Sequence, residues 1–335
     1  MYGLLGICLA LAALLTINAL ATLVGAASWR AISRPACGWP AATRARLLFA
    51  LRIFPATAAI VAVVALFVPS YVVYEPWRTG ETVSLKLAAL ALLSATGLAL
   101  AIWRGFASWR ATRRLIIDWM RHAEPIHIKG VSVPTYRVRH QFPVIAIVGV
   151  ISPGLFIGSR IFDALNDEEL SAAIAHEAGH LAARDNLKRW LMRACRDGLV
   201  IVPTGRSLDR AWNEATERAA DERAARAGGA HVALDLASAL VKIARMIPVG
   251  ATAAMPAGAY LIGEQIGYGI AGRVLELTRI AETREAHRRS YTKALGVVTW
   301  SVFGLFLIVV CLAATNQHVL ASLHAGIERI VAALS

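Results

Sequence analysis

The stretch LNDEELSAAIAHEAGHLAARD, residues 165–185, predicts a helix that carries two histidines on one face. Asn166 followed three residues later by Glu169 is typical of a capping box, in which the two residues satisfy each other's backbone N–H groups at a helix start. Apolar residues then recur at helical spacing and give the helix a buried face. We therefore expect HEAGH, residues 176–180, to lie well inside a helix.

The spacing of the two histidines fits a metal site. On a helix, residues i and i+4 lie one above the other, so His176 and His180 can direct their imidazoles at one ion. A catalytic zinc ion takes three protein ligands and keeps one position for water. Glu177 lies beside the first ligand, where it can take a proton from that water. The alternative is a solvated or core helix whose histidines bind nothing.

A second predicted helix, RSLDRAWNEATERAADERAARAGG at residues 206–229, supplies acidic candidates for the third ligand. Glu217 and Asp221 are four residues apart and share a face, and Glu214 precedes Glu217 by three. One acid can bind the metal while the other accepts an imidazole N–H and fixes its tautomer. We favour Glu217 over Glu214 as ligand; the alternative is that these charges are solvated or paired within the helix. Asp185 could pair with a neighbouring arginine or orient the active-site helices.

The composition predicts membrane segments. Of the 335 residues, 57% are hydrophobic and the mean hydropathy is +0.55, which exceeds what a soluble globular protein usually carries. The net charge of +13 could indicate nucleic-acid binding, but no compact basic and aromatic patch accompanies it, so we expect no direct nucleic-acid partner. Four apolar stretches are long enough to cross a bilayer, which takes about 20 residues of helix. They cover approximately residues 2–27, 53–74, 83–103 and 294–315.

The basic residues predict the orientation. The loop after the first span contains no acid and a series of arginines: Arg30, Arg34, Arg44, Arg46 and Arg52. Positive loops stay inside, so this loop and the central region should be cytoplasmic, in a protein of the inner (cytoplasmic) membrane. Three regions follow: residues 1–104 with three transmembrane helices, residues 105–290 as a cytoplasmic domain, and residues 291–335 with the fourth helix and a short outward tail.

The central region is expected to hold the globular fold. Residues 109–120 interleave apolar residues with arginines, which suits a helix on the inner membrane surface. Residues 134–162 are rich in β-branched residues and broken by prolines and glycines, so they predict two or three short strands. After Gly228-Gly229, residues 231–246 predict an amphipathic core helix. The predicted fold is a multi-pass α-helical membrane protein with four spans and an α+β domain inserted between the third and fourth.

These motifs resemble those of the gluzincin membrane metallopeptidases. HEAGH followed by Glu217-Arg218-Ala219-Ala220-Asp221 is similar to the HExxH…ExxAD pattern that two related groups share, the BlaR/MecR antirepressor type and the HtpX/CAAX-protease type. The layout of three spans, an insert and one span favours the BlaR/MecR type, as does the sequence ERAADE at residues 217–222. The Ser/Thr-His-Pro-Pro segment of the HtpX type is missing, and only its Arg-Ile/Val end has a counterpart, at Arg273-Val274.

The resemblance implies a zinc site with three ligands, a catalytic glutamate and a supporting aspartate. The ligands are His176, His180 and Glu217, the general base is Glu177, and Asp221 lies behind the first histidine. It also implies that the substrate lies extended along an edge strand from the segment Ala146–Ile157. Arg273 is a candidate for assisting the oxyanion. The tail after the fourth span is too short for the penicillin-binding sensor of BlaR proteins, so β-lactam sensing is not carried over.

The predicted function is a zinc-dependent endopeptidase of the membrane that cuts a cytoplasmic or membrane-proximal protein, such as a transcriptional repressor. Its expected partners are the lipid bilayer and a protein or peptide substrate. The alternatives are an HtpX-like quality-control protease and a non-catalytic membrane signalling or scaffold protein that keeps the fold. Glu177 argues against the scaffold, because a purely structural zinc site does not need this acid. A transporter has little support, because the spans carry almost no charge near their middles.

Overall fold

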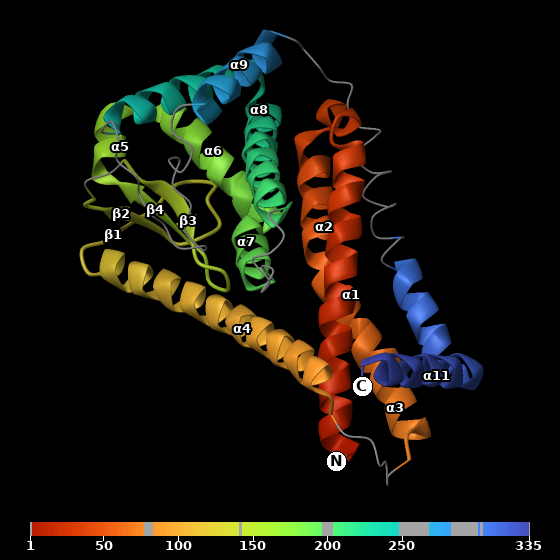
Figure 1. Ribbon diagram of the computed structural model, residues 1–335. Helices are drawn as coiled ribbons and strands as arrows, with labels where there is room; N and C mark the ends of the chain where they lie inside the picture. Colours follow the sequence, from red (N-terminus) through yellow and green to blue (C-terminus); the bar gives the residue numbers. More distant parts are fainter. Residues whose placement is uncertain are drawn as a thin grey trace.

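A four-stranded sheet with its covering helices lies beside a group of long apolar helices (Figure 1). The computed structural model describes residues 2–76, 83–140, 143–195, 204–247, 268–282, 301 and 304–334. The predicted border at residues 290–291 lies outside these residues.

Three long apolar segments coincide with the first three predicted spans. They are α1 (Tyr2–Ile32), then α2 (Ala41–Ala62) continued through the π-helical turn η2 (Val63–Phe67) and α3 (Val68–Tyr74), and finally α4 (Leu85–Met120). Each segment is long and apolar enough to cross a membrane. This composition is compatible with a membrane protein.

The predicted fourth span is described only in part. Helix Gly304–Thr315 is followed by α11 (Gln317–Leu334), and a bend of 87° separates the two helices. Together they are apolar enough for one broken span, while Ser207–Met246 is the fourth single helix that meets the same measure. That segment belongs to α8 (Thr204–Met246), which packs against α2, α6 and α9, and its Leu236, Leu240 and Ile243 are buried in these contacts.

Helix α4 is longer than the sequence suggested. A span ending near residue 103 and a separate surface helix from residue 109 were expected, but the two form one unbroken helix of 36 residues. Ser84 caps its start by accepting a hydrogen bond from the N–H of Leu87, and no proline interrupts it. Gly105 alone costs only about 1 kcal/mol, and its carbonyl accepts a hydrogen bond from Trp190. The predicted domain border at residues 104–105 therefore lies within this helix.

The sheet has four short strands. They are β1 (Glu124–Ile126), β2 (Thr135–Val138), β3 (Ile145–Val148) and β4 (Gly154–Gly158), in the order β1-β2-β4-β3. Strands β2 and β4 are parallel, and the other two pairs are antiparallel. The sequence predicted two or three strands; β1, three residues long and mostly exposed, carries too little apolar patterning to be recognised. In the described sheet, β3 is the edge strand that lies near His176 and His180 of α6. The segment Ala146–Ile157, expected as an edge, is therefore an edge in its first part, whereas β4 is an inner strand.

Both faces of the sheet are covered. On one face Ile145, Leu155 and their neighbours pack against α5 (Ser159–Ala164), α6 (Asp167–Ala183) and α8. On the other face Phe156 and its neighbours pack against Trp119 near the end of α4. Full burial of such side chains stabilises the fold by about 1.5–3 kcal/mol each. The sheet is thereby held between α4 and α6, as Figure 1 shows.

The helices around the sheet begin and end largely where the sequence indicated. Asn166 and Glu169 form the predicted capping box at the start of α6. Arg184, in the left-handed conformation with φ of 53°, ends α6 and turns the chain into α7 (Asp185–Ala194). Gly229, with φ of 77°, breaks α8 where the sequence predicted a helix end. Most of the stretch 247–272 lies outside the described residues, and α9 (Tyr268–Glu282) follows it.

Glu169 ties α6 to α8, and its removal should destabilise the fold. Its buried carboxylate accepts hydrogen bonds from Ser238 at 2.6 Å and Lys242 at 2.6 Å, besides the N–H of Asn166 at 3.0 Å. We expect Glu169→Ala to lower the free energy of unfolding by about 2–3 kcal/mol, measured by thermal or denaturant unfolding in detergent. Glu168→Ala, at the exposed neighbouring position, should change it by less than about 0.5 kcal/mol. Equal effects of the two changes would contradict this role.

The same carboxylate should make stability depend on pH. Burial raises the pKa of Glu169, but the hydrogen bonds from Lys242, Ser238 and Asn166 outweigh it and hold the pKa below the usual 4.5. A carboxylate with a lowered pKa stabilises the folded state above its ordinary pKa and loses this effect as acid protonates it. The difference in stability between wild type and Glu169→Ala should therefore shrink as the pH falls below about 4.5.

Candidate metal centre

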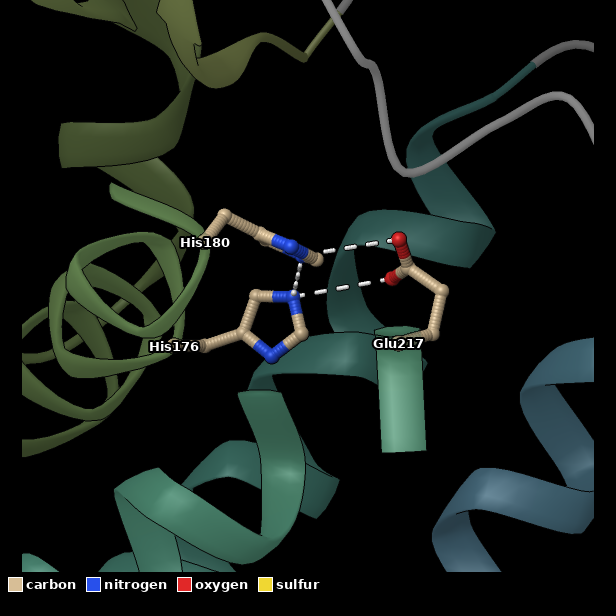
Figure 2. Close-up of side chains that lie close together, drawn as sticks. All are labelled: His176, His180 and Glu217. Atoms are coloured by element: carbon tan, nitrogen blue, oxygen red, sulfur yellow. Dashed lines mark hydrogen bonds and ion pairs between the residues drawn. The ribbon is translucent and has the colours of Figure 1, made fainter. Parts of the chain in front are cut away.

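Helix α6 brings the two histidines of HEAGH together. His176 Nε2 lies 3.2 Å from His180 Nε2, and both rings point toward α8 (Figure 2). His176 is buried with 1% of its surface exposed, and His180 is nearly as buried. The i, i+4 spacing thus produces a pair of nitrogen ligands that face one point.

Glu217 on α8 completes the group. Its Oε2 lies 3.6 Å from His176 Nε2, and its Oε1 lies 3.5 Å from His180 Nε2. Glu214, the other acid considered from the sequence, is half exposed and pairs with Arg218 on its own helix. Of the two acids, Glu217 is therefore the one that faces the histidines.

The geometry of these three side chains fits a zinc ion. Ligand atoms bound tetrahedrally at about 2.0–2.2 Å from zinc lie about 3.3–3.6 Å from each other. The two imidazole nitrogens lie 3.2 Å apart, and each lies 3.5–3.6 Å from one of the two Glu217 oxygens, which is close to that spacing. In addition, Glu217 Oε1 is buried and accepts no hydrogen bond from the residues that the structure describes. Two imidazoles and one carboxylate are a donor set of catalytic zinc sites with an open position.

A second group of ligand-type side chains lies between the end of α3 and α11. It consists of Glu75, His324 and Glu328. The imidazole nitrogen lies 3.8 Å from each carboxylate, and Glu328 is 40% exposed. This wider and more solvated group fits zinc less well than the group on α6 and α8.

A carboxylate lies within hydrogen-bond distance of the Nδ1 atom of each histidine. His176 Nδ1 lies 2.8 Å from Asp221 Oδ1, and His180 Nδ1 lies 2.9 Å from Asp185 Oδ2. Such partners fix the tautomer so that Nε2 presents its lone pair to the metal position. The resemblance to gluzincins implied Asp221 behind the first histidine, whereas Asp185 was expected only to pair with a neighbouring arginine or to orient the active-site helices. The turn at Arg184 is what returns Asp185 to His180, and spacing alone does not reveal it.

Arg273 on α9 links the two acids of α8. Its Nε and Nη2 each donate a hydrogen bond to Asp221 at 2.7 Å, and its Nη1 donates to Glu217 at 3.0 Å. The sequence suggested Arg273 for the oxyanion, whereas its guanidinium is already occupied by these carboxylates. Burial raises the pKa of Glu217, but His180 and Arg273 lower it more, and Glu217 is therefore an anion.

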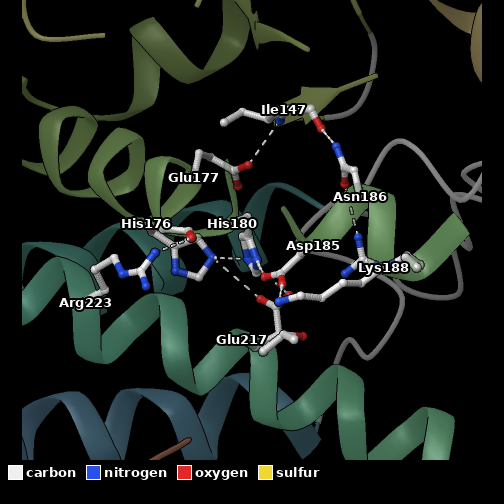
Figure 3. A network of polar contacts seen from close by, with 12 residues as sticks. Ile147, His176, Glu177, His180, Asp185, Asn186, Lys188, Glu217 and Arg223 are labelled. Atoms are coloured by element: carbon white, nitrogen blue, oxygen red, sulfur yellow. Dashed lines mark hydrogen bonds and ion pairs between the residues drawn. The ribbon is translucent and has the colours of Figure 1, made fainter. Parts of the chain in front are cut away.

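Glu177 lies on the other side of the histidines, against strand β3. Its Oε2 accepts a hydrogen bond from the N–H of Ile147 at 3.1 Å (Figure 3), while no described residue donates one to Oε1. Burial raises the pKa of Glu177, against the opposing effect of His180 and His176. A carboxyl group with a raised pKa, and with one oxygen that accepts no hydrogen bond from the described part of the chain, is suited to transferring protons.

Gly179 allows α6 and α8 to approach closely. A Cβ at this position would lie 3.1 Å from the Cα and 3.2 Å from the Cβ of Ala220, tighter than ordinary contact. Arg223 Nη1 also donates a hydrogen bond of 2.9 Å to the carbonyl of Gly179. Ala220, the residue before Asp221, therefore packs directly on Gly179, the residue before His180.

Residues 144–287 match the sequence model of Peptidase family M48. The match extends from the start of β3 past α9 and includes the histidines, Glu177, Glu217 and Arg273. It supports a metallopeptidase of family M48, whose members are zinc enzymes, and it does not distinguish the BlaR/MecR type. No curated protein matches the chain.

A side chain at Gly179 should disrupt the metal centre. In Gly179→Val, α8 must move away from α6, which separates Glu217 from the histidines. We expect zinc affinity to fall at least about tenfold and the fold to lose about 1–3 kcal/mol, measured by zinc titration and thermal unfolding. Ala178→Val places the same side chain, valine, at the exposed neighbouring position and should leave zinc affinity unchanged. Unchanged zinc affinity in Gly179→Val would refute the close-packing argument.

Zinc binding should release a proton from His176. Burial lowers the pKa of His176, but its hydrogen bond with Asp221 raises it to about 9 in the metal-free protein. Below that pH the proton must leave before Nε2 can bind zinc, so zinc affinity should fall as the pH decreases from about 9 toward 7. Calorimetry at pH 7 in buffers of different ionisation enthalpy should show about one proton released per zinc. Asp221→Asn, which removes the group that raises the pKa, should release less.

Proposed function

We propose that the chain is a zinc-dependent membrane endopeptidase that hydrolyses peptide bonds of a cytoplasmic or membrane-proximal protein. The observation that carries this proposal is the arrangement of His176, His180 and Glu217 at zinc-ligand spacing with Glu177 beside them. The match of residues 144–287 to Peptidase family M48 supports the same reaction class.

His176, His180 and Glu217 would hold the metal, and Asp221 and Asp185 orient the two histidines. His176 and His180 offer their Nε2 atoms, because Asp221 and Asp185 retain the protons on the Nδ1 atoms. Glu217 offers a carboxylate whose negative charge partly balances the cation. When bound there, zinc supplies a Lewis acid that polarises the scissile carbonyl and makes water more acidic.

Glu177 performs the proton transfers in this mechanism. Ile147 fixes its Oε2, which leaves Oε1 to accept a proton from the attacking water. The raised pKa of Glu177 lets the carboxyl group retain that proton until it is passed to the nitrogen of the leaving amine. The same oxygen thus acts first as a base and then as an acid.

The membrane setting follows from the apolar helices and from their contacts with the catalytic part. We place the chain in the inner membrane with the site on the cytoplasmic side. Buried Arg52 in α2 lies 3.2 Å from Asp209 in α8, which supports placing this part of α2 on the same side of the membrane as the catalytic helices. The layout that resembles the BlaR/MecR type favours regulatory cleavage, for instance of a repressor, over quality control.

Replacement of Glu177 should separate metal binding from catalysis. We expect Glu177→Gln to retain zinc but to lower the rate of casein cleavage by about 10²–10⁴-fold, because amide oxygen is a poor base. His180→Ala should lose both zinc and cleavage. The measurements are zinc content by mass spectrometry and fluorescence release from labelled casein, on the full chain in detergent.

Glu214 provides the matched control for the ligand glutamate. Glu217→Ala should lose zinc and activity, whereas Glu214→Ala, three residues earlier on the same helix, should keep both. Equal residual cleavage by wild type and Glu177→Gln would refute the protease assignment.

A further inference from the structure

Among the residues that the structure describes, strand β3 pairs with β4 alone and is an edge of the sheet. The carbonyl of Val144 accepts a hydrogen bond of 2.7 Å from Gly158 at the end of β4. Because backbone groups alternate in direction along a strand, Ile147 turns its N–H and C=O away from β4. Such an edge is where an extended peptide can add as a further strand, with its own N–H bonded to the outward carbonyl of Ile147.

Two side chains of the protein itself form hydrogen bonds with the N–H and the C=O of Ile147. The N–H of Ile147 donates to Glu177, and its carbonyl accepts a hydrogen bond of 2.7 Å from Asn186 Nδ2 (Figure 3). The same Nδ2 lies 3.2 Å from the carbonyl of Gly149. The carboxamide of Asn186 thus makes the hydrogen bonds that the backbone N–H groups of a bound peptide would make.

The position of Asn186 connects this edge to the metal centre. Asn186 follows Asp185, which holds His180, and Arg189 Nη1 lies 3.4 Å from Asn186 Oδ1. All four residues of β3 are buried, so the edge is closed beside Glu177 in this state. A peptide that pairs with Ile147 must therefore displace the carboxamide.

We propose that Asn186 is a latch that imitates substrate: it occupies the carbonyl of Ile147 until an extended peptide replaces it. This inference rests on the proposed peptidase function and adds a substrate class to it. The site should accept unfolded segments that present a backbone N–H to Ile147. Proline lacks that N–H and cannot replace the carboxamide, so proline at the pairing position should block cleavage.

Removal of the latch should strengthen substrate binding. Neither Asn186→Ala nor Asn186→Asp can donate to the two carbonyls, so peptide no longer competes with a side chain. We expect KM for fluorescein-labelled β-casein to fall about three- to tenfold in both variants, with kcat within about twofold of wild type. Glu168→Ala, at an exposed position on α6, should change neither constant.

Equilibrium binding separates this inference from the peptidase assignment. Fluorescence anisotropy of the labelled casein with the zinc-loaded full chain should give a lower Kd for both Asn186 variants, whether or not the casein is cut. An equal or higher Kd, or loss of zinc in both variants, would overturn the latch. Absence of cleavage by every zinc-loaded form, together with the lower Kd, would instead overturn the peptidase function and leave the latch in place.

Discussion

The close contact of α6 with α8 is the constraint on which the metal centre depends. Gly179 lies between Glu177 and His180, and its missing side chain lets Ala220 approach to packing distance. Glu217 and Asp221 flank Ala220 on α8, so this contact brings both acids to the histidines. One small residue on each helix therefore determines the separation of four polar groups.

Those polar groups form a network in which each charge has a partner. The imidazoles contact three acids, and Arg273 contacts two of them. In a buried site an unpaired charge is costly, whereas a paired one also has a fixed orientation. The same arrangement that makes the acids tolerable in the interior thus keeps the Nε2 atoms directed at one point.

Local patterns were sufficient to predict the parts of this arrangement that lie on single helices. The capping box of α6, the shared face of His176 and His180, and the break near Gly229 follow from spacing and turn chemistry over a few residues. The partners that come from distant or turning segments were not predictable in this way. Asp185 reaches His180 only because Arg184 reverses the chain, and Arg273 arrives from α9 after a stretch with no recognisable pattern. The continuity of α4 was also missed, because changes in composition do not by themselves end a helix.

The continuity of α4 has a mechanical consequence. At 1.5 Å per residue, its 36 residues form a rod about 54 Å long, with apolar residues at one end and Trp119 against the sheet at the other. A rigid rod of that length that tilts by about 5° about one end displaces the other end by about 5 Å. Such a displacement would act on the side of the sheet opposite the zinc ligands. A movement at the apolar end of α4 would therefore reach the sheet whose edge strand β3 contacts Glu177.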